Sequence, residues 1–214
     1  MKLSTLIAAS FISLTAPIQA YADTFSDAVA AFKDGHFSTA YDLFYGLAQK
    51  EHALAQLNIA TMTAKGDGII QSDKDALFWA WRARLAGTNQ AIPTIQYLTS
   101  RTTPEDQQVV AQELRFTYSD QFDQGDKRAA FKLGRTLNEI YVPRDVQGAY
   151  VWFTIAAALN IKYAKALRET ISAELDVPAR TKAQNDARIY LTQWCLRQTN
   201  KPNVCDNIAN GTDN

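Results

Sequence analysis

The chain has 214 residues, of which 22 are basic and 22 acidic, and its mean hydropathy is −0.24. The balanced charge argues against a nucleic-acid-binding protein, which normally carries a basic surface, and the low hydropathy excludes a multi-pass membrane protein. The length suits one domain or a short array of repeats, and the 33 Ala, nine Gly and six Pro favour helices over a turn-rich β-sandwich.

Residues 1–22 have the pattern of a secretory signal peptide. Lys2 is followed by an uncharged apolar run, and Ala20 and Ala22 place small residues at positions −3 and −1 of a cleavage site before Asp23. The run is shorter than the roughly 20 residues of a membrane span. The leader also lacks a cysteine for a lipid anchor and an Arg-Arg pair. We therefore expect export without stable membrane insertion, to the periplasm or, alternatively, to the extracellular medium.

Between residues 23 and 197 the apolar residues recur at helical spacing, without an alternating run of strand length. Gly35 and Gly87 are the expected ends of two helices, and Thr103 followed by Pro104 is an expected helix start. The chain is therefore predicted to be all-α, with the helices in five pairs. The predicted pairs are residues 25–34 with 37–50, 53–65 with 73–86, 88–100 with 104–122, 126–140 with 145–159, and 161–173 with 178–197.

A pattern of Ala, Trp and Ala occurs twice, 73 residues apart, and a weaker echo about 36 residues earlier gives the length of one repeat. One helix pair of this length cannot bury its apolar face alone, so neighbouring pairs must stack, as in a solenoid. We expect the alanines to let helices approach closely and the Trp to fill the gap to the next pair. The residues of the pattern are Ala76, Trp79 and Ala83, then Ala149, Trp152 and Ala156.

The segment from Ala55 to Gly87 resembles the Sel-like repeat, a relative of the tetratricopeptide repeat, because loop glycines and an Asp precede the Ala-Trp-Ala pattern at the family's spacing. Residues 126–159 resemble it again, although Tyr141-Val-Pro143 replaces the loop glycines and predicts a different turn. The strong resemblance covers roughly a third of the chain. The residues of this repeat signature are Gly66, Gly68, Ala76, Trp79, Ala83, Gly87, Gly134, Ala149, Trp152 and Ala156.

The resemblance implies a right-handed superhelical solenoid of about five antiparallel helix pairs that binds proteins or peptides and is not an enzyme. Similar exported proteins of Gram-negative bacteria act as adaptors or regulators, so the expected partner is an envelope or secreted protein. By analogy, the first helix of each pair lines a concave groove. For each expected groove residue, a place in the core or on a solvated face is the alternative. These residues are Leu57, Thr61, Ala64, Lys65, Phe131, Arg135, Asn138 and Glu139.

Cys195 and Cys205 are the only cysteines and lie ten positions apart. In an exported chain such a pair predicts one disulfide, worth about 3 kcal/mol in the chain-entropy model. It would tether a polar C-terminal tail, residues 198–214, to the last helix. A redox-active pair is the alternative, but reactive pairs usually lie two residues apart at a helix start.

Motifs for catalysis, for a cofactor or for a metal are missing from the sequence. His36 and His52 lie outside any zinc-ligand spacing and are expected in turns. Two alternatives to a binding module stay open. A cell-wall-associated hydrolase would need acids with perturbed pKa values in a cleft. A non-catalytic glycan binder would need exposed aromatic residues, for which Trp81 and Trp194 are the freer tryptophans.

Overall fold

The computed structural model describes residues 16–209, with side chains from Thr24 to Ile208, and this part of the chain forms eleven helices without a β-strand. The predicted all-α class is therefore confirmed. Residues 1–15 of the predicted signal peptide lie outside the described residues, and the signal stays a prediction. The helices are α1 (Ala16–Lys33), α2 (Phe37–Gln49), α3 (Ala53–Lys65), α4 (Asp73–Leu85), α5 (Ala91–Thr99), α6 (Pro104–Asp123), α7 (Lys127–Glu139), α8 (Val146–Ala158), α9 (Ala164–Ser172), α10 (Val177–Arg197) and α11 (Asn203–Ala209).

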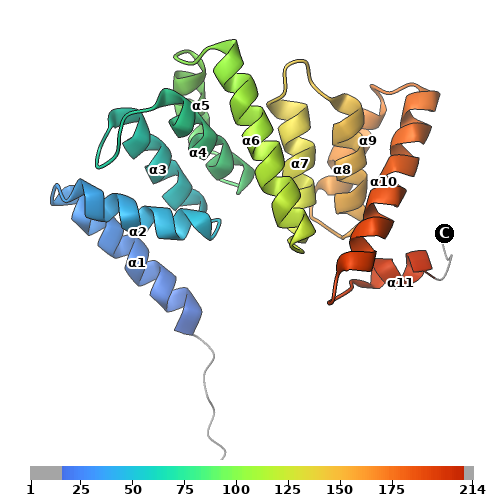
Figure 1. Cartoon of the computed structure of the whole chain (residues 1–214), viewed down its shortest axis with the longest axis horizontal. Coiled ribbons are helices and arrows are strands. Elements are labelled where there is room, and N and C mark those ends of the chain that lie inside the picture. Colours follow the sequence, from blue (N-terminus) through green and yellow to red (C-terminus); the bar gives the residue numbers. More distant parts are fainter. Residues whose placement is uncertain (1–15, 210–214) are drawn as a thin grey trace, which may run out of the picture.

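Most helices pack on the next helix in the chain, from α1 and α2 at one end of the molecule to α10 and α11 at the other (Figure 1). Two predicted pairs are wrong, because α5 packs mainly on α4 instead of α6, and α9 packs mainly on α8 instead of α10. Contacts between helices two apart in the chain join α3 to α5, α4 to α6 and α8 to α10. Helix α8 is packed on several sides, by α7, α9 and α10.

The predicted helix ends agree with the structure where a specific residue sets them. Gly35 and Gly87 have φ values of 79° and 112°, which favour glycine and end α1 and α4. The Thr103 hydroxyl accepts a hydrogen bond from the backbone N–H of Asp106 and caps α6. Helix α9 begins three residues later than predicted because Tyr163, in the turn before it, has a φ of 68°.

Two features of the C-terminal region differ from the predictions. Residues 203–209, expected to belong to a polar tail, form helix α11. Trp194, expected to be one of the freer tryptophans, is only 1% exposed. A buried indole needs an apolar environment and a partner for its N–H. Phe122 of α6 supplies both, because its ring stacks on the indole and its carbonyl oxygen accepts the hydrogen bond.

The sequence repeat has a structural counterpart, because α3, α4, α7 and α8 are each 13 residues long. The Ala-Trp-Ala pattern falls on α4 and α8, and its four alanines are completely buried. Trp79 packs edge-on against Tyr45 of α2, and Trp152 packs edge-on against Phe122 of α6. Each Trp therefore contacts the helix pair that precedes its own in the chain, whereas we expected it to contact the pair that follows. Trp152 makes that contact as well, by stacking on Tyr190 of α10.

The loops of the two matching pairs differ, as predicted from the missing glycines. Gly66 and Gly68 have φ values of 78° and 77° in the α3–α4 loop, while the α7–α8 loop contains a cis peptide bond before Pro143. A Cβ atom on Gly68 would lie 2.5 Å from the carbonyl oxygen of Phe37. The α3–α4 loop is thus in close contact with the start of α2. Inside α7, a Cβ on Gly134 would meet the ring of α8 residue Phe153 at 2.7 Å.

Candidate functional site

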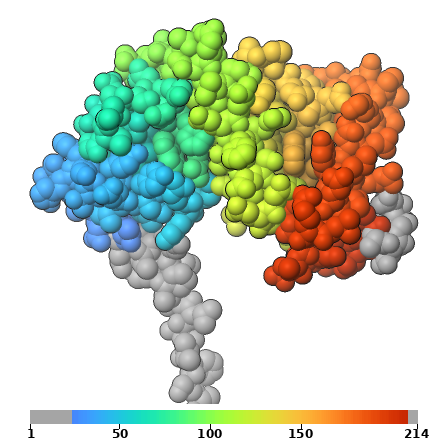
Figure 2. Space-filling model, viewed as in Figure 1, coloured from blue at the N-terminus to red at the C-terminus, as the bar shows by residue number. Residues whose placement is uncertain are grey.

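A groove lies between α6 and α10, with α8 between them, and we call it the α6–α10 groove. It consists of two adjoining cavities of about 330 and 290 Å³. Arg115 of α6, Trp152 of α8 and Tyr190 of α10 line both cavities, which makes the groove continuous. Figure 2 shows atoms of α7 and α8 between those of α6 and α10. The lining residues are Gln112, Arg115, Phe116, Ser119, Leu133, Leu137, Asp145, Gln147, Gly148, Val151, Trp152, Asp186 and Tyr190.

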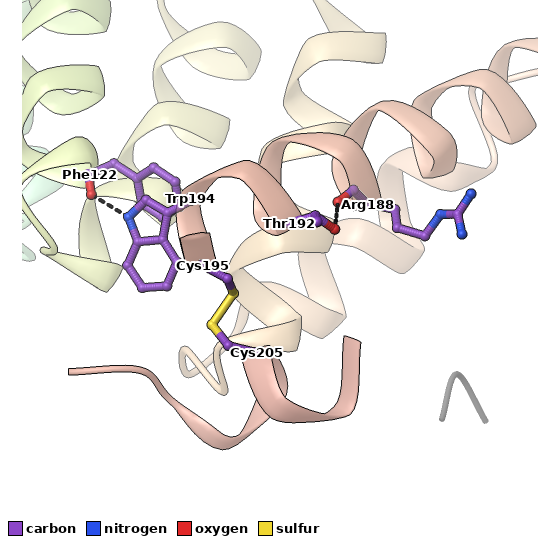
Figure 3. The surroundings of a disulfide bond; sticks show 6 residues. All are labelled: Phe122, Arg188, Thr192, Trp194, Cys195 and Cys205. Carbon is purple, nitrogen blue, oxygen red and sulfur yellow. Dashed lines mark hydrogen bonds between the residues drawn. A yellow bond between two sulfur atoms is a disulfide. The ribbon is translucent and has the colours of Figure 1, made fainter. Parts of the chain in front are cut away.

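The C-terminal ends of α6 and α10 converge and are fastened to each other (Figure 1). The indole N–H of Trp194 donates a hydrogen bond of 2.6 Å to the carbonyl oxygen of Phe122, and the two rings stack with centroids 5.0 Å apart (Figure 3). Arg197 adds an exposed ion pair to Asp123, with 2.6 Å between Nη2 and Oδ1. These contacts set the angle between the two walls of the groove.

Three aromatic side chains give the groove its apolar surface. The rings of Trp152 and Tyr190 lie at an interplanar angle of 10°, with centroids 6.1 Å apart. Phe116 is 75% exposed and Tyr190 51% exposed. Large aromatic side chains left in water beside a groove are typical of a surface that a partner covers, because their burial releases much apolar area from water.

The charged residues of the groove differ in whether they have partners. Asp145 accepts a hydrogen bond from the backbone N–H of Gly148 at the start of α8, and Asp186 accepts one from Lys182. Within residues 24–208, no hydrogen bond or ion pair is made by the side chain of Arg115. Its charge acts on Tyr141, whose pKa is raised by burial, a rise that the positive charge of Arg115 opposes. The groove therefore presents one guanidinium group without a counter-ion.

A second polar cluster surrounds Glu51, in the turn between α2 and α3. Its Oε1 accepts hydrogen bonds from Arg82 of α4 and Gln121 of α6, and its Oε2 accepts one from Lys132 of α7, at 2.6 Å. Burial alone would raise the pKa of this carboxyl group, but the charges of Lys132 and Arg82 lower it to about 2. The group is therefore an ionised partner of two buried cations.

The sequence could not reveal the Glu51 cluster, because its members lie 31, 70 and 81 positions from Glu51. In the structure, Glu51 has a φ of 63°, a value uncommon outside glycine. A residue in that conformation is held by its surroundings, and here the two cations and the amide hold it.

The predicted groove residues of the second pair lie on α3. Leu57 and Ala64 are half-buried, and Lys65 is exposed. Thr61 is half-buried, and its hydroxyl donates a hydrogen bond to the carbonyl oxygen of Leu57. Helix α3 packs on α2, α4 and α5, whereas α7, which carries the rest of the predicted set, packs on α6 and α8.

The predicted groove residues of the fourth pair are largely engaged within the protein. Phe131 packs against the ring of Phe153. Arg135 is 6% exposed and donates two hydrogen bonds of 2.7 Å to the carboxylate of Glu139. A third bond joins Arg135 to the Arg84 carbonyl oxygen, and Asn138 accepts a hydrogen bond from Arg144. None of these eight residues on α3 and α7 lines the α6–α10 groove as the structure describes it.

The remaining sequence predictions concern cysteine and histidine. Cys195 and Cys205 form the predicted disulfide, with Cα atoms 5.5 Å apart, and it links α10 to α11 (Figure 3). His52 caps α3 by accepting a hydrogen bond from the backbone N–H of Ala55, in agreement with its predicted place in a turn. His36 also lies in a turn, immediately before α2.

Within the described part of the chain, no group of His, Cys, Asp and Glu residues could hold a metal ion, and no helix is long and apolar enough to cross a membrane. Comparisons of the chain with protein-family models, with curated proteins and with solved structures found no match. The interpretation of the α6–α10 groove therefore depends on its own geometry and charge.

Proposed function

We propose that this protein is an exported protein-interaction module, an adaptor or regulator that holds a peptide segment of an envelope or secreted protein in the α6–α10 groove. The observation that carries the proposal is the pair of adjoining cavities lined by Trp152, Tyr190 and the exposed Phe116. A groove of this shape, with aromatic walls and few charges, suits the side chains of a polypeptide.

Rigid walls favour such binding, because a partner then does not have to order the site. Trp194 and Phe122 fasten the C-terminal ends of the two wall helices, and Trp152 is packed between Phe122 and Tyr190. The site is thus built from helices with long-range contacts rather than from loops. This preorganisation supports a binding role.

We further propose that the helix pairs are Sel-like repeats arranged in a right-handed solenoid. The buried alanines of the Ala-Trp-Ala pattern, the equal lengths of α3, α4, α7 and α8, and the chain-order packing support this arrangement. Export is supported by the N-terminal leader pattern and by the Cys195–Cys205 disulfide, since disulfides persist in oxidising compartments. We place the protein in the periplasm, with secretion to the medium as the alternative.

Site-specific photo-crosslinking in living cells tests the proposal. A photo-reactive phenylalanine analogue at position 116 is expected to capture one envelope or secreted protein. The same analogue at Tyr97, an exposed aromatic residue of α5, is the matched control and is expected to capture none. A Tyr190→Ala substitution should abolish the capture at position 116 without unfolding the protein, since Tyr190 is half exposed. Equal capture at both positions, or none at position 116, would contradict the proposed site.

The two alternatives gain less support. A hydrolase would need an acid with a raised pKa in a cleft, and among residues 24–208 the carboxyl groups with shifted pKa values, Glu51 and Glu169, are shifted downward by cationic neighbours. For a glycan binder, Trp81 is half-buried and Trp194 is in the core, which leaves Trp152 with Tyr190 as the aromatic pair on which a sugar ring could stack.

A further inference from the structure

We infer that the α6–α10 groove selects a segment in which an acidic side chain lies beside a bulky apolar one, with the carboxylate bound by Arg115. This inference rests on the proposed binding function and specifies the partner's chemistry. It follows from the unpaired guanidinium group of Arg115 and from the position of this residue in the groove.

The unpaired guanidinium group of Arg115 points to an acidic partner. The two carboxylates that line the groove already accept hydrogen bonds, Asp145 from the backbone of α8 and Asp186 from Lys182. Arg115 has neither a hydrogen bond nor an ion pair among residues 24–208. The aromatic side chains of Trp152 and Tyr190 line the same cavities. A guanidinium group presents several donors in a planar fork that matches a carboxylate, and covering it without an anion would cost desolvation energy.

The position of Arg115 indicates an acid within a chain rather than at its end. Arg115 lines both cavities, so it lies where they join. A bound chain that fills both cavities must pass this point and continue on either side. The acid is therefore expected to be an Asp or Glu side chain, and the C-terminal carboxylate of a partner is not the proposed ligand.

The neighbours of Arg115 determine the second part of the motif. Phe116 and Tyr190 are exposed beside it, and Trp152 lies between α6 and α10. An aromatic or large aliphatic side chain next to the acid would bury this surface. It would also lower the local dielectric constant and so strengthen the ion pair. Acid and apolar side chain are thus expected at adjacent or nearly adjacent positions.

A peptide selection with a matched arginine control tests the inference. The purified protein is used to select from a phage-displayed library of random dodecapeptides, fused through their C-termini so that only side-chain carboxylates are available. Arg188 is the control, because it is an exposed arginine of α10 that lines a different cavity, beside α11. Its side chain extends away from Phe122 and Trp194 (Figure 3). Enriched peptides are synthesised and their affinities measured by calorimetry.

The enriched peptides are expected to share Asp or Glu within two positions of Phe, Tyr, Trp or Leu. Changing that acid to its amide, or changing Arg115→Gln, should each weaken binding about tenfold or more. Both changes together should weaken binding little further, and Arg188→Gln should leave it unchanged. Arg115→Lys should retain part of the affinity, because the charge is kept, and raised salt should weaken the wild-type complex.

Two outcomes would overturn the inference, and they are distinguishable from a failure of the proposed function. Peptides that bind the groove equally well with the acid amidated, or equally well to the Arg115→Gln protein, would show that the groove binds segments but does not select an acid. If synthetic peptides bind only when their C-terminal carboxylate is free, then Arg115 binds the end of the chain and not an Asp or Glu side chain. Lack of any enrichment, together with lack of crosslinking at Phe116, would contradict the binding function itself.

Discussion

The carboxylate of Glu51 accepts a hydrogen bond from the ammonium group of Lys132, with 2.6 Å between Oε2 and Nζ, although the two residues lie 81 positions apart. Arg82 binds the other carboxylate oxygen, and so does Gln121. One side chain in the α2–α3 turn thereby joins α4, α6 and α7, which belong to three different helix pairs. Of the ion pairs described among residues 24–208, the one between Glu51 and Lys132 joins the residues farthest apart in the sequence.

The stability of the protein should fall in acid because of Glu51. The folded-state pKa of this carboxyl group is about 2, below its ordinary value of 4.5, so its contribution is fully present above pH 4.5 and is lost as the pH falls toward 2. The shift corresponds to about 3 kcal/mol of unfolding free energy. Urea denaturation at a series of pH values between 2 and 7 measures it.

The Glu51→Gln protein should lack most of this acid dependence and should be less stable at pH 7 by about 3 kcal/mol, because Arg82 and Lys132 then stay buried without an anion. Glu113→Gln is the control, since Glu113 is exposed and its carboxylate has no partner among residues 24–208. Equal pH dependence of the Glu51→Gln and wild-type proteins would disprove the role given to this cluster.

Replacing Gly68 by Ala should destabilise the protein by about 2 kcal/mol or more. The added Cβ would lie 2.5 Å from the Phe37 carbonyl oxygen, and the φ of 77° is unfavourable for alanine. Gly46→Ala is the matched control, because Gly46 lies inside α2 with open space around its Cα, so the same change should stabilise by about 0.5 to 1 kcal/mol. Thermal unfolding followed by circular dichroism compares the two variants, and shifts of the same sign would refute the argument.

Trp194→Phe should cost about 1 to 2 kcal/mol and loosen the contact between α6 and α10. The substitution removes the indole N–H that joins the two helices, while the Phe122 carbonyl oxygen keeps its hydrogen bond from the backbone N–H of Gly125. Hydrogen exchange at the C-terminal turns of both helices should rise. Trp81→Phe serves for comparison, because in the described part of the chain Trp81 donates no hydrogen bond, and an equal effect of both substitutions would contradict this reading.

Reduction of the Cys195–Cys205 disulfide should release α11 before the rest of the protein unfolds. Helix α11 has seven residues and packs mainly on α10, so the disulfide is its principal attachment. Amide exchange in residues 203–209 is expected to become fast under reducing conditions and in the Cys195→Ser, Cys205→Ser protein, while α1 to α10 keep their protection. Unchanged protection of α11 after reduction would show that packing alone holds it.

The sequence by itself determined helices α1 to α10, the pairing of α1 with α2, of α3 with α4 and of α7 with α8, and the disulfide. Helical spacing, Gly35, Gly87 and the Thr103 cap are local signals, and local signals act through hydrogen bonds within a few residues. The 73-residue recurrence likewise identified α4 and α8 as equivalent helices with buried alanines. The groove residues on α3 and α7 were expected from the family resemblance. Such a resemblance does not show which polar side chains pair within the protein, as Arg135 pairs with Glu139.

Only the tertiary structure decided where the candidate site lies. The α6–α10 groove depends on how α6 and α10 flank α8, and their C-terminal ends are joined by Trp194 and Phe122, 72 positions apart. The Glu51 cluster likewise depends on contacts across 31 to 81 positions. Periodicity tells which face of one helix is buried, but the crossing angle between two helices follows from how all their side chains interlock. The position of the unpaired Arg115 between two aromatic walls is a consequence of that packing.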